Sequence, residues 1–240
     1  MSKKRKSGKL KIIFTGGTGR FANVFKNVKN NFKIFYPSKK ELNILDKSSI
    51  IKYIKRKKTK YFIHAAGLSR PMSIHDKDLE KSIMLNIIGT SNVVIACSKF
   101  NLKLIYFSTG YVYPGKIGNY KEDQPLKPFN KYAWSKLGGE ASVKLYDNSL
   151  ILRLIMCEKP FIHSTAYDDI KTNFIFHEEV AKYLPKLLNQ KGVLNVGGKI
   201  QSIYNFAKKY NPKIKKTSGK HYYPRNISMN IGKLQKILKR

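Results

Sequence analysis

The stretch "LKIIFTGGTGRFA", residues 10–22, decides the fold of this chain. Its first half is a run of β-branched and aromatic residues typical of a buried strand, and its second half begins an amphipathic helix. Gly16, Gly19 and Ala22 follow one another at three-residue spacing. Small residues at this spacing let the backbone bend sharply and approach a phosphate. A glycine turn alone also fits a structural hairpin, but at the first strand-to-helix junction it indicates a dinucleotide site.

The following residues repeat this alternation of short apolar segments and longer amphipathic ones. Strands are predicted at residues 9–17, 32–37, 60–67, 102–109 and 149–155. Helices are predicted at residues 20–30, 48–57, 82–101 and 130–146. Strands that are each followed by a helix form a parallel sheet covered on both faces. The sequence therefore predicts an α/β fold, a doubly wound parallel sheet of the Rossmann type.

Three regions are expected along the chain. Residues 1–9 form a basic, disordered tail, and residues 10–156 form the dinucleotide-binding Rossmann domain. Beyond this point the pattern weakens, and no low-complexity linker appears. Helices are expected there at residues 177–190 and 201–210, and a strand at residues 192–198. Residues 157–240 are therefore expected to pack on the first domain as a small C-terminal region.

Composition narrows the class of protein. The net charge of +34 suggests nucleic-acid binding, but only seven of the 48 basic residues are arginines. Recognition of phosphates through paired hydrogen bonds favours arginine, so we expect no specific nucleic-acid partner. No apolar run approaches the roughly 20 residues that span a bilayer. Cys97 and Cys157 are the only cysteines, which fits a reducing compartment, and we expect a cytoplasmic protein without a membrane span.

The end of the second predicted strand bears on the choice of cofactor. A carboxylate there would bind the adenosine ribose of NAD, whereas cations favour the 2′-phosphate of NADP. The strand ends in "YPSKKE", which places Lys39 and Lys40 at this point, and Arg20 follows the glycine turn. We therefore expect NADPH, with NADH as the alternative. Asp46 comes later and is expected beside the adenine rather than on the ribose.

Two further motifs lie around the fourth strand and the helix that follows it. Ser108 and Thr109 end the strand, at the edge of a parallel sheet where ligands bind. "YAWSK" then opens the helix, and its Tyr132 and Lys136 lie four residues apart on one helix face. Such a pair is common by chance in a chain rich in both residues. By themselves the two residues fit either a proton donor with its activator or two exposed neighbours.

The order of these motifs, a glycine turn, "ST" after the fourth strand and "YAWSK" in the next helix, resembles the extended short-chain dehydrogenase/reductase family. Within that family the chain resembles dTDP-4-dehydrorhamnose reductases and related sugar-nucleotide reductases. This likeness covers most of the chain from Leu10 and rests on "STGYVYPG", "YKEDQPLKPFNKYAWSKLGGE", "GVLNVGGKIQSIYNFAKKY" and "PRNISMNIGKLQKIL". It implies NADPH-dependent reduction of a nucleotide-linked 4-keto-6-deoxy sugar for polysaccharide or glycan precursors, with residues 157–240 binding the substrate.

The resemblance also implies a role for each site residue. Tyr132 would be the general acid that protonates the carbonyl oxygen, and Thr109 would hydrogen-bond the same oxygen. Lys136 would hold the nicotinamide ribose and lower the pKa of the phenol, which is about 10 when unperturbed. The remaining cofactor contacts would come from Gly16, Thr18, Gly19, Arg20, Phe21, Lys39, Asp46, Ala65, Ala66 and Gly67, together with Tyr132 and Lys136.

The chain departs from these relatives beside the predicted active site. Gly110 and Tyr111 stand where related dehydratases carry an Asp–Glu pair, so dehydration is not expected. Tyr111 also replaces the cysteine of epimerising relatives. Rhamnose reductases usually carry Asp where Gly110 stands, which leaves the positioning of the substrate open. The segment 158–176 is shorter than the family's substrate region, so the sugar and the nucleotide are not defined.

Several alternatives stay open. A 4-epimerase would hold NAD without net consumption, and a regulatory subunit of this family would keep the fold without catalysis. A homodimer is also compatible with the resemblance. His64 ends the third predicted strand, a segment that the resemblance places along the adenosine side of the cofactor, and it is expected to make a backbone contact rather than to act in catalysis. Arg153 is expected to contact either a ligand or a carboxylate. No metal site is expected, because the histidines are scattered without ligand spacing.

Overall fold

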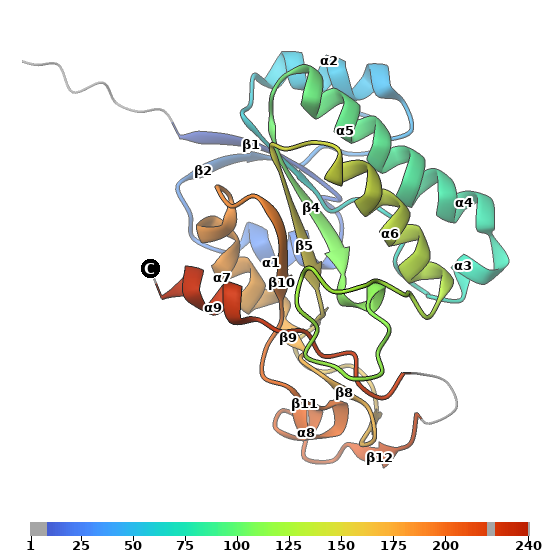
Figure 1. Ribbon diagram of the computed structural model, residues 1–240. Coiled ribbons are helices and arrows are strands. Elements are labelled where there is room, and N and C mark those ends of the chain that lie inside the picture. The colour runs from blue at the N-terminus through green and yellow to red at the C-terminus, as the bar shows by residue number, and fades with distance from the viewer. Residues whose placement is uncertain (1–8, 220–223, 240) are drawn as a thin grey trace, which may run out of the picture.

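The computed structural model describes residues 9–219 and 224–239. The predicted basic tail, residues 1–9, lies outside the described residues except for Lys9. Within the described part, six parallel strands form the main sheet in the order β10-β5-β4-β3-β1-β2 (Figure 1). The strands are β1 (Leu10–Thr15), β2 (Phe32–Phe35), β3 (Tyr61–His64), β4 (Lys103–Thr109), β5 (Ser149–Leu154) and β10 (Gly192–Val196). The prediction of a parallel, Rossmann-like sheet is confirmed.

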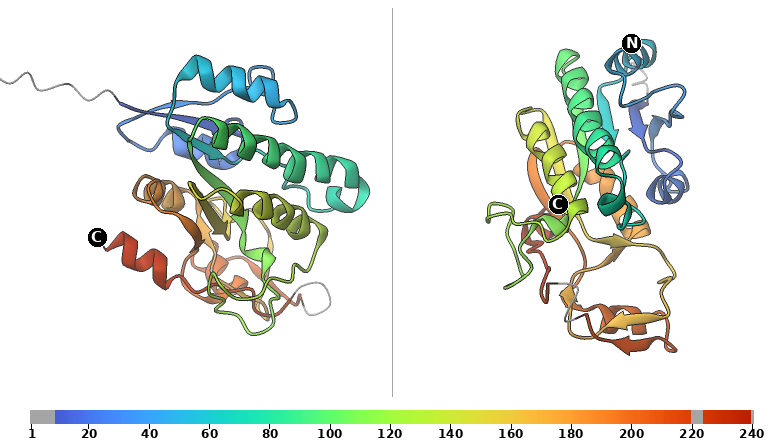
Figure 2. Two further views of the ribbon diagram at one scale, coloured as in Figure 1. Left: turned by 45° about the horizontal axis from the view of Figure 1, so that its top comes forward. Right: turned by 90° about the vertical axis from the view of Figure 1, so that its right-hand side faces the viewer.

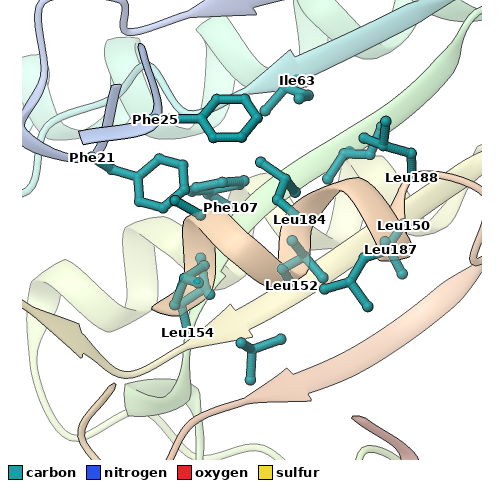
Figure 3. Close-up of a cluster of buried hydrophobic side chains, with 14 of the residues drawn as sticks. Phe21, Phe25, Ile63, Phe107, Leu150, Leu152, Leu154, Leu184, Leu187 and Leu188 are labelled. Atoms are coloured by element: carbon teal, nitrogen blue, oxygen red, sulfur yellow. The ribbon is translucent and has the colours of Figure 1, made fainter. Parts of the chain in front are cut away.

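Helices cover both faces of this sheet because the side chains of each buried strand alternate between them. Ile12 and Phe14 of β1 point to one face, where they pack with residues of α1 (Arg20–Lys26), α7 (His177–Leu187) and α9 (Gly232–Leu238). Ile13 points to the other face and packs with α2 (Lys47–Lys57), α5 (Gly89–Lys99) and α6 (Lys131–Lys144). Figure 3 shows the first of these cores, in which Phe21 and Phe25 meet leucines of α7 and β5. The two cores hold the strand ends in fixed register.

The long helix predicted at residues 82–101 is present but locally widened. It runs through α4 (Leu79–Ile83), a π-helical turn η1 (Met84–Ile88) and α5, and it follows the short α3 (Ile74–Lys77). The span Leu79–Lys99 is long and apolar enough to cross a membrane by length and composition. Val93, Ala96 and Cys97 of this helix are fully buried in the core of the second face. It is therefore a core helix of the α/β domain.

The predicted boundary at residue 156 does not separate two compact regions. β10, α7 and α9 all come from residues 157–240, yet β10 pairs with β5 as a strand of the main sheet. The sheet recruits this strand because β5 would otherwise be left with an unpaired edge. Only part of the C-terminal segment stands apart from the sheet.

That separate part is a small lobe below the carboxyl ends of the strands (Figures 1 and 2). It is built from short paired strands and one helix around a cluster of aromatic side chains that includes Phe161, Phe176 and Phe206. Its elements are β6 (Met156–Cys157), β7 (Thr165–Tyr167), β8 (Lys171–Thr172), β9 (Ile175–Phe176), β11 (Gln201–Ser202), α8 (Ile203–Lys208) and β12 (Lys215–Thr217). The lobe and the sheet edge face each other across a cavity.

Candidate active site

A cavity of about 480 Å³ opens between the carboxyl ends of the strands and the small lobe. From the sheet side it is lined by Arg20, Thr109 and Tyr132, and from the lobe side by Phe161, His163 and other residues of 154–170. Ligands of open α/β sheets bind at this edge. The cavity therefore brings three of the predicted site residues together with the C-terminal segment.

The glycine turn is tight, and it needs its glycines. Gly16 has a φ of +79°, and a Cβ atom there would lie 2.9 Å from the backbone of Ala65 and Ala66. The Gly19 N–H donates to the Gly16 carbonyl oxygen at 2.9 Å, which closes the turn just before α1. A side chain at position 16 would push apart the β1 and β3 loops. The predicted cofactor residues Gly16, Gly19, Ala65 and Ala66 thus lie side by side.

Some of the other predicted cofactor residues lie at the glycine turn, whereas others lie away from the cavity. Thr18 is exposed on the turn, whereas the ring of Phe21 is buried in the core against Phe14 and Phe107, so only its backbone faces the turn. Asp46 caps α2, because its Oδ1 accepts from the Ser48 N–H at 2.8 Å. Lys39 is exposed in the loop after β2 and is not among the residues that line the cavity.

Thr109 and Tyr132 meet at the cavity wall. Thr109 ends β4, and Tyr132 lies in the first turn of α6, where the Asn130 side chain caps the helix by accepting from the Ala133 N–H at 2.8 Å. Both side chains line the cavity. Burial raises the pKa of Tyr132, while the neighbouring Thr109 side chain acts in the opposite direction. The phenol is therefore protonated at neutral pH, as a proton donor must be.

Lys136 lies one turn further along α6 and is buried with only 7% of its surface exposed. Its Nζ stands 4.2 Å from the centroid of the Tyr106 ring. Burial lowers the pKa of Lys136 to about 7, against the opposing effect of the Glu140 carboxylate. The lowering of the Tyr132 pKa expected from this ammonium stays a prediction for the protein with its cofactor.

His64 and Arg153, which the sequence did not assign to catalysis, both have buried partners within the protein. His64 is fully buried, with Nδ1 2.9 Å from Thr15 Oγ1 and Nε2 3.1 Å from Thr90 Oγ1, so it joins β1, β3 and α5. Arg153 forms a fully buried ion pair with Glu140. Glu140 in turn accepts from Ser108 Oγ at 2.8 Å, so the pair anchors the end of β4 to α6. Arg153 is not among the residues that line the cavity.

Sequence reasoning missed Asn86, which connects two parts of the site. Its Nδ2 donates to the Leu68 carbonyl oxygen at 2.9 Å and to Ser135 Oγ at 2.8 Å, and its Oδ1 accepts from the Leu68 N–H at 2.7 Å. It thereby ties the loop after β3 to the "YAWSK" turn. The signal was present as a single amide in the apolar stretch "MLNII", since a buried polar side chain needs partners.

The sequence analysis also passed over Arg70 and Glu158. Both line the cavity, and they form an ion pair there together with Arg20. Nothing local marked these residues, because the contact joins segments 88 and 138 residues apart. Among the described residues, no three side chains of His, Cys, Asp or Glu cluster as metal ligands would.

The glycine at position 110 has a packing reason. A Cβ atom there would lie 2.6 Å from Cδ1 of Ile155 and 2.8 Å from Sδ of Met229. An aspartate at this position would therefore displace both side chains. The absence of a side chain at Gly110 lets Ile155 and Met229 pack closely against η2 (Gly110–Val112).

The sequence matches known proteins over somewhat more than half of its length. The β subunit of methionine adenosyltransferase 2 from Xenopus laevis is 30% identical over 142 residues, which are 55% of this chain and 42% of that protein. The spore coat polysaccharide biosynthesis protein SpsK of Bacillus subtilis is 26% identical over 138 residues, 56% of this chain and 48% of that protein. The chain thus matches less than half the length of these relatives.

Solved structures share the fold over nearly the whole chain. The dTDP-4-dehydrorhamnose reductase of Bacillus anthracis in complex with NADP has a TM-score of 0.86 at 22% identity, over 96% of this chain and 92% of that chain. The enzyme WbmG of Bordetella bronchiseptica in complex with NAD and UDP has a TM-score of 0.75 at 18% identity, over 96% and 89%. The RmlD substrate binding domain profile matches residues 10–157. The chain belongs to this RmlD family, and its structural neighbours include dTDP-4-dehydrorhamnose reductases.

Proposed function

We propose that this protein reduces the 4-keto group of a nucleotide-linked 6-deoxy sugar with NADPH, in the synthesis of polysaccharide or glycan precursors in the cytoplasm. The observation that carries the proposal is that Thr109 and Tyr132 line the same cavity, with Lys136 one helical turn from Tyr132 on α6. The family and the fold of NADP-bound neighbours support it. A substrate carbonyl that enters the cavity would meet both hydroxyls at once.

The cradle around Gly16 and Gly19 fits a dinucleotide, because any side chain at position 16 would fill the space beside Ala65 and Ala66. A bound nicotinamide cofactor supplies the hydride. Thr109 and Tyr132 hold the carbonyl oxygen of the substrate, and Tyr132 transfers its phenolic proton to that oxygen as negative charge develops there. Lys136 would bind the ribose hydroxyls and favour reprotonation of the phenol. The ring of Tyr106 positions the Lys136 ammonium.

The preference for NADPH remains part of the proposal, because structural neighbours are bound to NADP or to NAD. Lys39 and Lys40 are both exposed after β2 and free of the ion pairs found among the described residues. Their cations are available for the 2′-phosphate. The Asp46 side chain accepts the hydrogen bond that caps α2. If Asp46 lies beside the adenine, it must do so while it keeps this hydrogen bond.

The deciding experiment is NADPH oxidation measured against a panel of 4-keto-6-deoxy sugar nucleotides, with dTDP-, UDP- and GDP-linked members. We expect stoichiometric oxidation with at least one of them, and the product should carry a hydroxyl at C4. The same assay run with NADH tests the cofactor preference. A protein that binds NADPH but oxidises none of it with any member of the panel would not be this reductase.

A second candidate follows from the relatives matched by sequence. Several of them are β subunits of methionine adenosyltransferase 2, so this chain could serve an assembly through the same fold. A subunit of that kind would retain NADPH binding without turnover and would change the activity of its partner. A 4-epimerase, as named for two structural neighbours, would instead convert sugar nucleotides without net cofactor consumption. NADPH oxidation separates the reductase from the other two functions, and analysis of the sugar-nucleotide products separates the epimerase from the subunit.

We also propose that the protein forms a homodimer. Exposed apolar side chains lie on the outer helices, among them Leu79, Ile95 and Trp134, with 51–58% of their surfaces exposed. Apolar groups of this size on adjoining helices favour association. Sedimentation equilibrium with wild type and a Trp134→Glu variant tests it, and a monomeric wild type would contradict it.

A further inference from the structure

One carboxylate at the cavity mouth holds two arginines. Arg20 Nη1 lies 2.6 Å from Glu158 Oε1, and Arg70 Nη1 lies 3.0 Å from the same oxygen and 3.3 Å from Oε2. Arg20 is the first residue of α1, directly after the glycine turn, and Arg70 lies in the loop after β3. Glu158 follows β6 in the C-terminal segment. All three side chains line the cavity.

This arrangement is how proteins bind a phosphate oxygen. Guanidinium groups that converge on one oxygen recognise phosphates and carboxylates with the same geometry. The arginines remain 45% and 38% exposed, whereas the carboxylate between them is only 19% exposed. The arginines can therefore be reached from solvent once the carboxylate moves aside. Lys159 and Pro160 follow Glu158 in a segment between β6 and β7, so its side chain is not held in a helix or strand.

We propose that Arg20 and Arg70 form a phosphate clamp that Glu158 closes in the free protein, so that a diphosphate ligand must displace this carboxylate to bind. This inference rests on the proposed function for the identity of the diphosphate, which is that of the cofactor or that of the sugar nucleotide. The clamp makes phosphate ligands compete with an internal anion. It also couples the glycine turn to the lobe, since Glu158 leaves the arginines when a ligand enters.

A purely structural ion pair is the competing explanation. Such a pair would join α1 and the β3 loop to the lobe, and its loss would lower stability without tightening any ligand. The clamp predicts instead that loss of the ion pair increases the affinity for phosphate ligands. Removing the carboxylate charge frees both arginines, so phosphate ligands should bind more tightly. Removing either arginine should weaken the same ligands.

The test is isothermal titration calorimetry of the whole chain with inorganic pyrophosphate, NADPH and dTDP at one fixed salt concentration. Glu158→Gln should tighten pyrophosphate by between about 2-fold and about 30-fold, the range given by the loss of two partly exposed ion pairs. Arg20→Gln and Arg70→Gln should each weaken it. Asp168→Asn is the matched control, because it removes one carboxylate that pairs with Lys216 and does not line the cavity. Arg56→Gln is the corresponding arginine control.

The arms of the experiment identify the ligand. Tightening of NADPH in Glu158→Gln assigns the clamp to the cofactor, and tightening of dTDP assigns it to the substrate; both outcomes support the clamp. If Glu158→Gln and Asp168→Asn changed pyrophosphate affinity equally, the effect would come from the net charge of the protein alone, and the clamp proposal would be overturned. Pyrophosphate binding that is indifferent to both arginine variants would also overturn it. Because pyrophosphate binding needs no turnover, absence of reductase activity would refute the proposed function and leave the clamp to be judged separately. Melting temperatures confirm that each variant is folded.

Discussion

Tyr106 holds Lys136 at both ends: its hydroxyl donates to the Lys136 carbonyl oxygen at 3.2 Å, and the Lys136 ammonium lies 4.2 Å from the centroid of its ring. Tyr106 is fully buried in β4, so it is itself fixed by the sheet. The ammonium consequently has a defined position beside the carboxyl end of β4. Its charge depends on pH, because burial places the pKa of Lys136 at about 7.

The first prediction concerns this charge. Below a pH of about 7 Lys136 is a cation in the free protein, and above it the side chain loses its proton. The kcat/KM for reduction reports ionisations of the free enzyme, so it should fall as the pH rises through about 7. Tyr132 adds no second fall near neutrality, because burial raises its pKa. A pH profile of NADPH oxidation between pH 6 and about 9 is the measurement.

The control for that profile is Lys136→Arg, whose guanidinium stays charged over the whole range. We expect lower activity in this variant but no fall near neutrality. A wild-type profile that stays flat to the alkaline end would show that Lys136 is not the group that titrates.

The second prediction concerns cofactor preference. Replacing Lys39 and Lys40 together with Ala removes the two exposed cations after β2. NADPH binding should weaken by about 5-fold to about 100-fold, because each lost charge-assisted hydrogen bond to the 2′-phosphate is worth about 1 kcal/mol or more. NADH binding should stay the same. Fluorescence titration of both cofactors measures this, with Lys208→Ala plus Lys209→Ala as the matched pair on α8 and just beyond it. Equal losses for NADPH and NADH would contradict the assignment.

The third prediction concerns acid stability. Burial lowers the pKa of His64 to about 3 from an ordinary value of 6.5. A histidine with a lowered folded-state pKa binds protons more readily when unfolded, so the folded state should lose stability as the pH falls below 6.5. Each unit of difference is worth about 1.4 kcal/mol, which gives a loss of about 3 kcal/mol by a pH of about 4. Urea unfolding at several pH values measures it.

His64→Asn provides the comparison, since an amide can hydrogen-bond Thr15 and Thr90 but does not titrate. The free energy of unfolding of this variant should depend less steeply on pH, and the two curves should converge as the pH falls. Parallel curves for the two proteins would assign the acid sensitivity to other groups.

The sequence allowed the main sheet to be predicted well because its strands are buried on both faces and each is followed by an amphipathic helix. The five strands expected before residue 156 are all present. The joining of β10 to β5 could not be predicted, because strand pairing between such distant segments is decided by tertiary packing. The helix α9 was also missed. It has seven residues, no side-chain cap and one buried side chain, Leu234, so it carries almost no local signal.

The site residues likewise include some that the sequence could predict and others that it could not. Thr109, Tyr132 and the glycine turn follow from motifs fixed to strand ends, and the structure brings them to one edge of the sheet. Asn86 could have been found from its polarity within an apolar helix. The meeting of Arg20 and Arg70 on Glu158 depends on how the small lobe folds back, which no spacing in the chain encodes.

The fourth prediction concerns Tyr132 itself. Tyr132→Phe removes one hydroxyl and keeps the ring, which packs 5.2 Å from the His75 ring and 6.4 Å from the Tyr111 ring between centroids. Turnover should fall by roughly 10²- to 10⁴-fold, the usual contribution of a general acid. Cofactor affinity should fall far less than turnover, because the phenol acts mainly on the substrate and Lys136 still holds the ribose. Single-turnover NADPH oxidation and a cofactor titration test both parts, with Tyr210→Phe, a half-exposed tyrosine of the small lobe, as the control.

Lys136→Ala should damage both turnover and cofactor binding, and the double variant should be little worse in turnover than the poorer single one. Residues that act as one unit are strongly non-additive, since either loss removes the same step. Additive losses would mean that Tyr132 and Lys136 act independently. Wild-type turnover in Tyr132→Phe would show that the two residues merely share a helix face and that a group other than Tyr132 protonates the carbonyl oxygen.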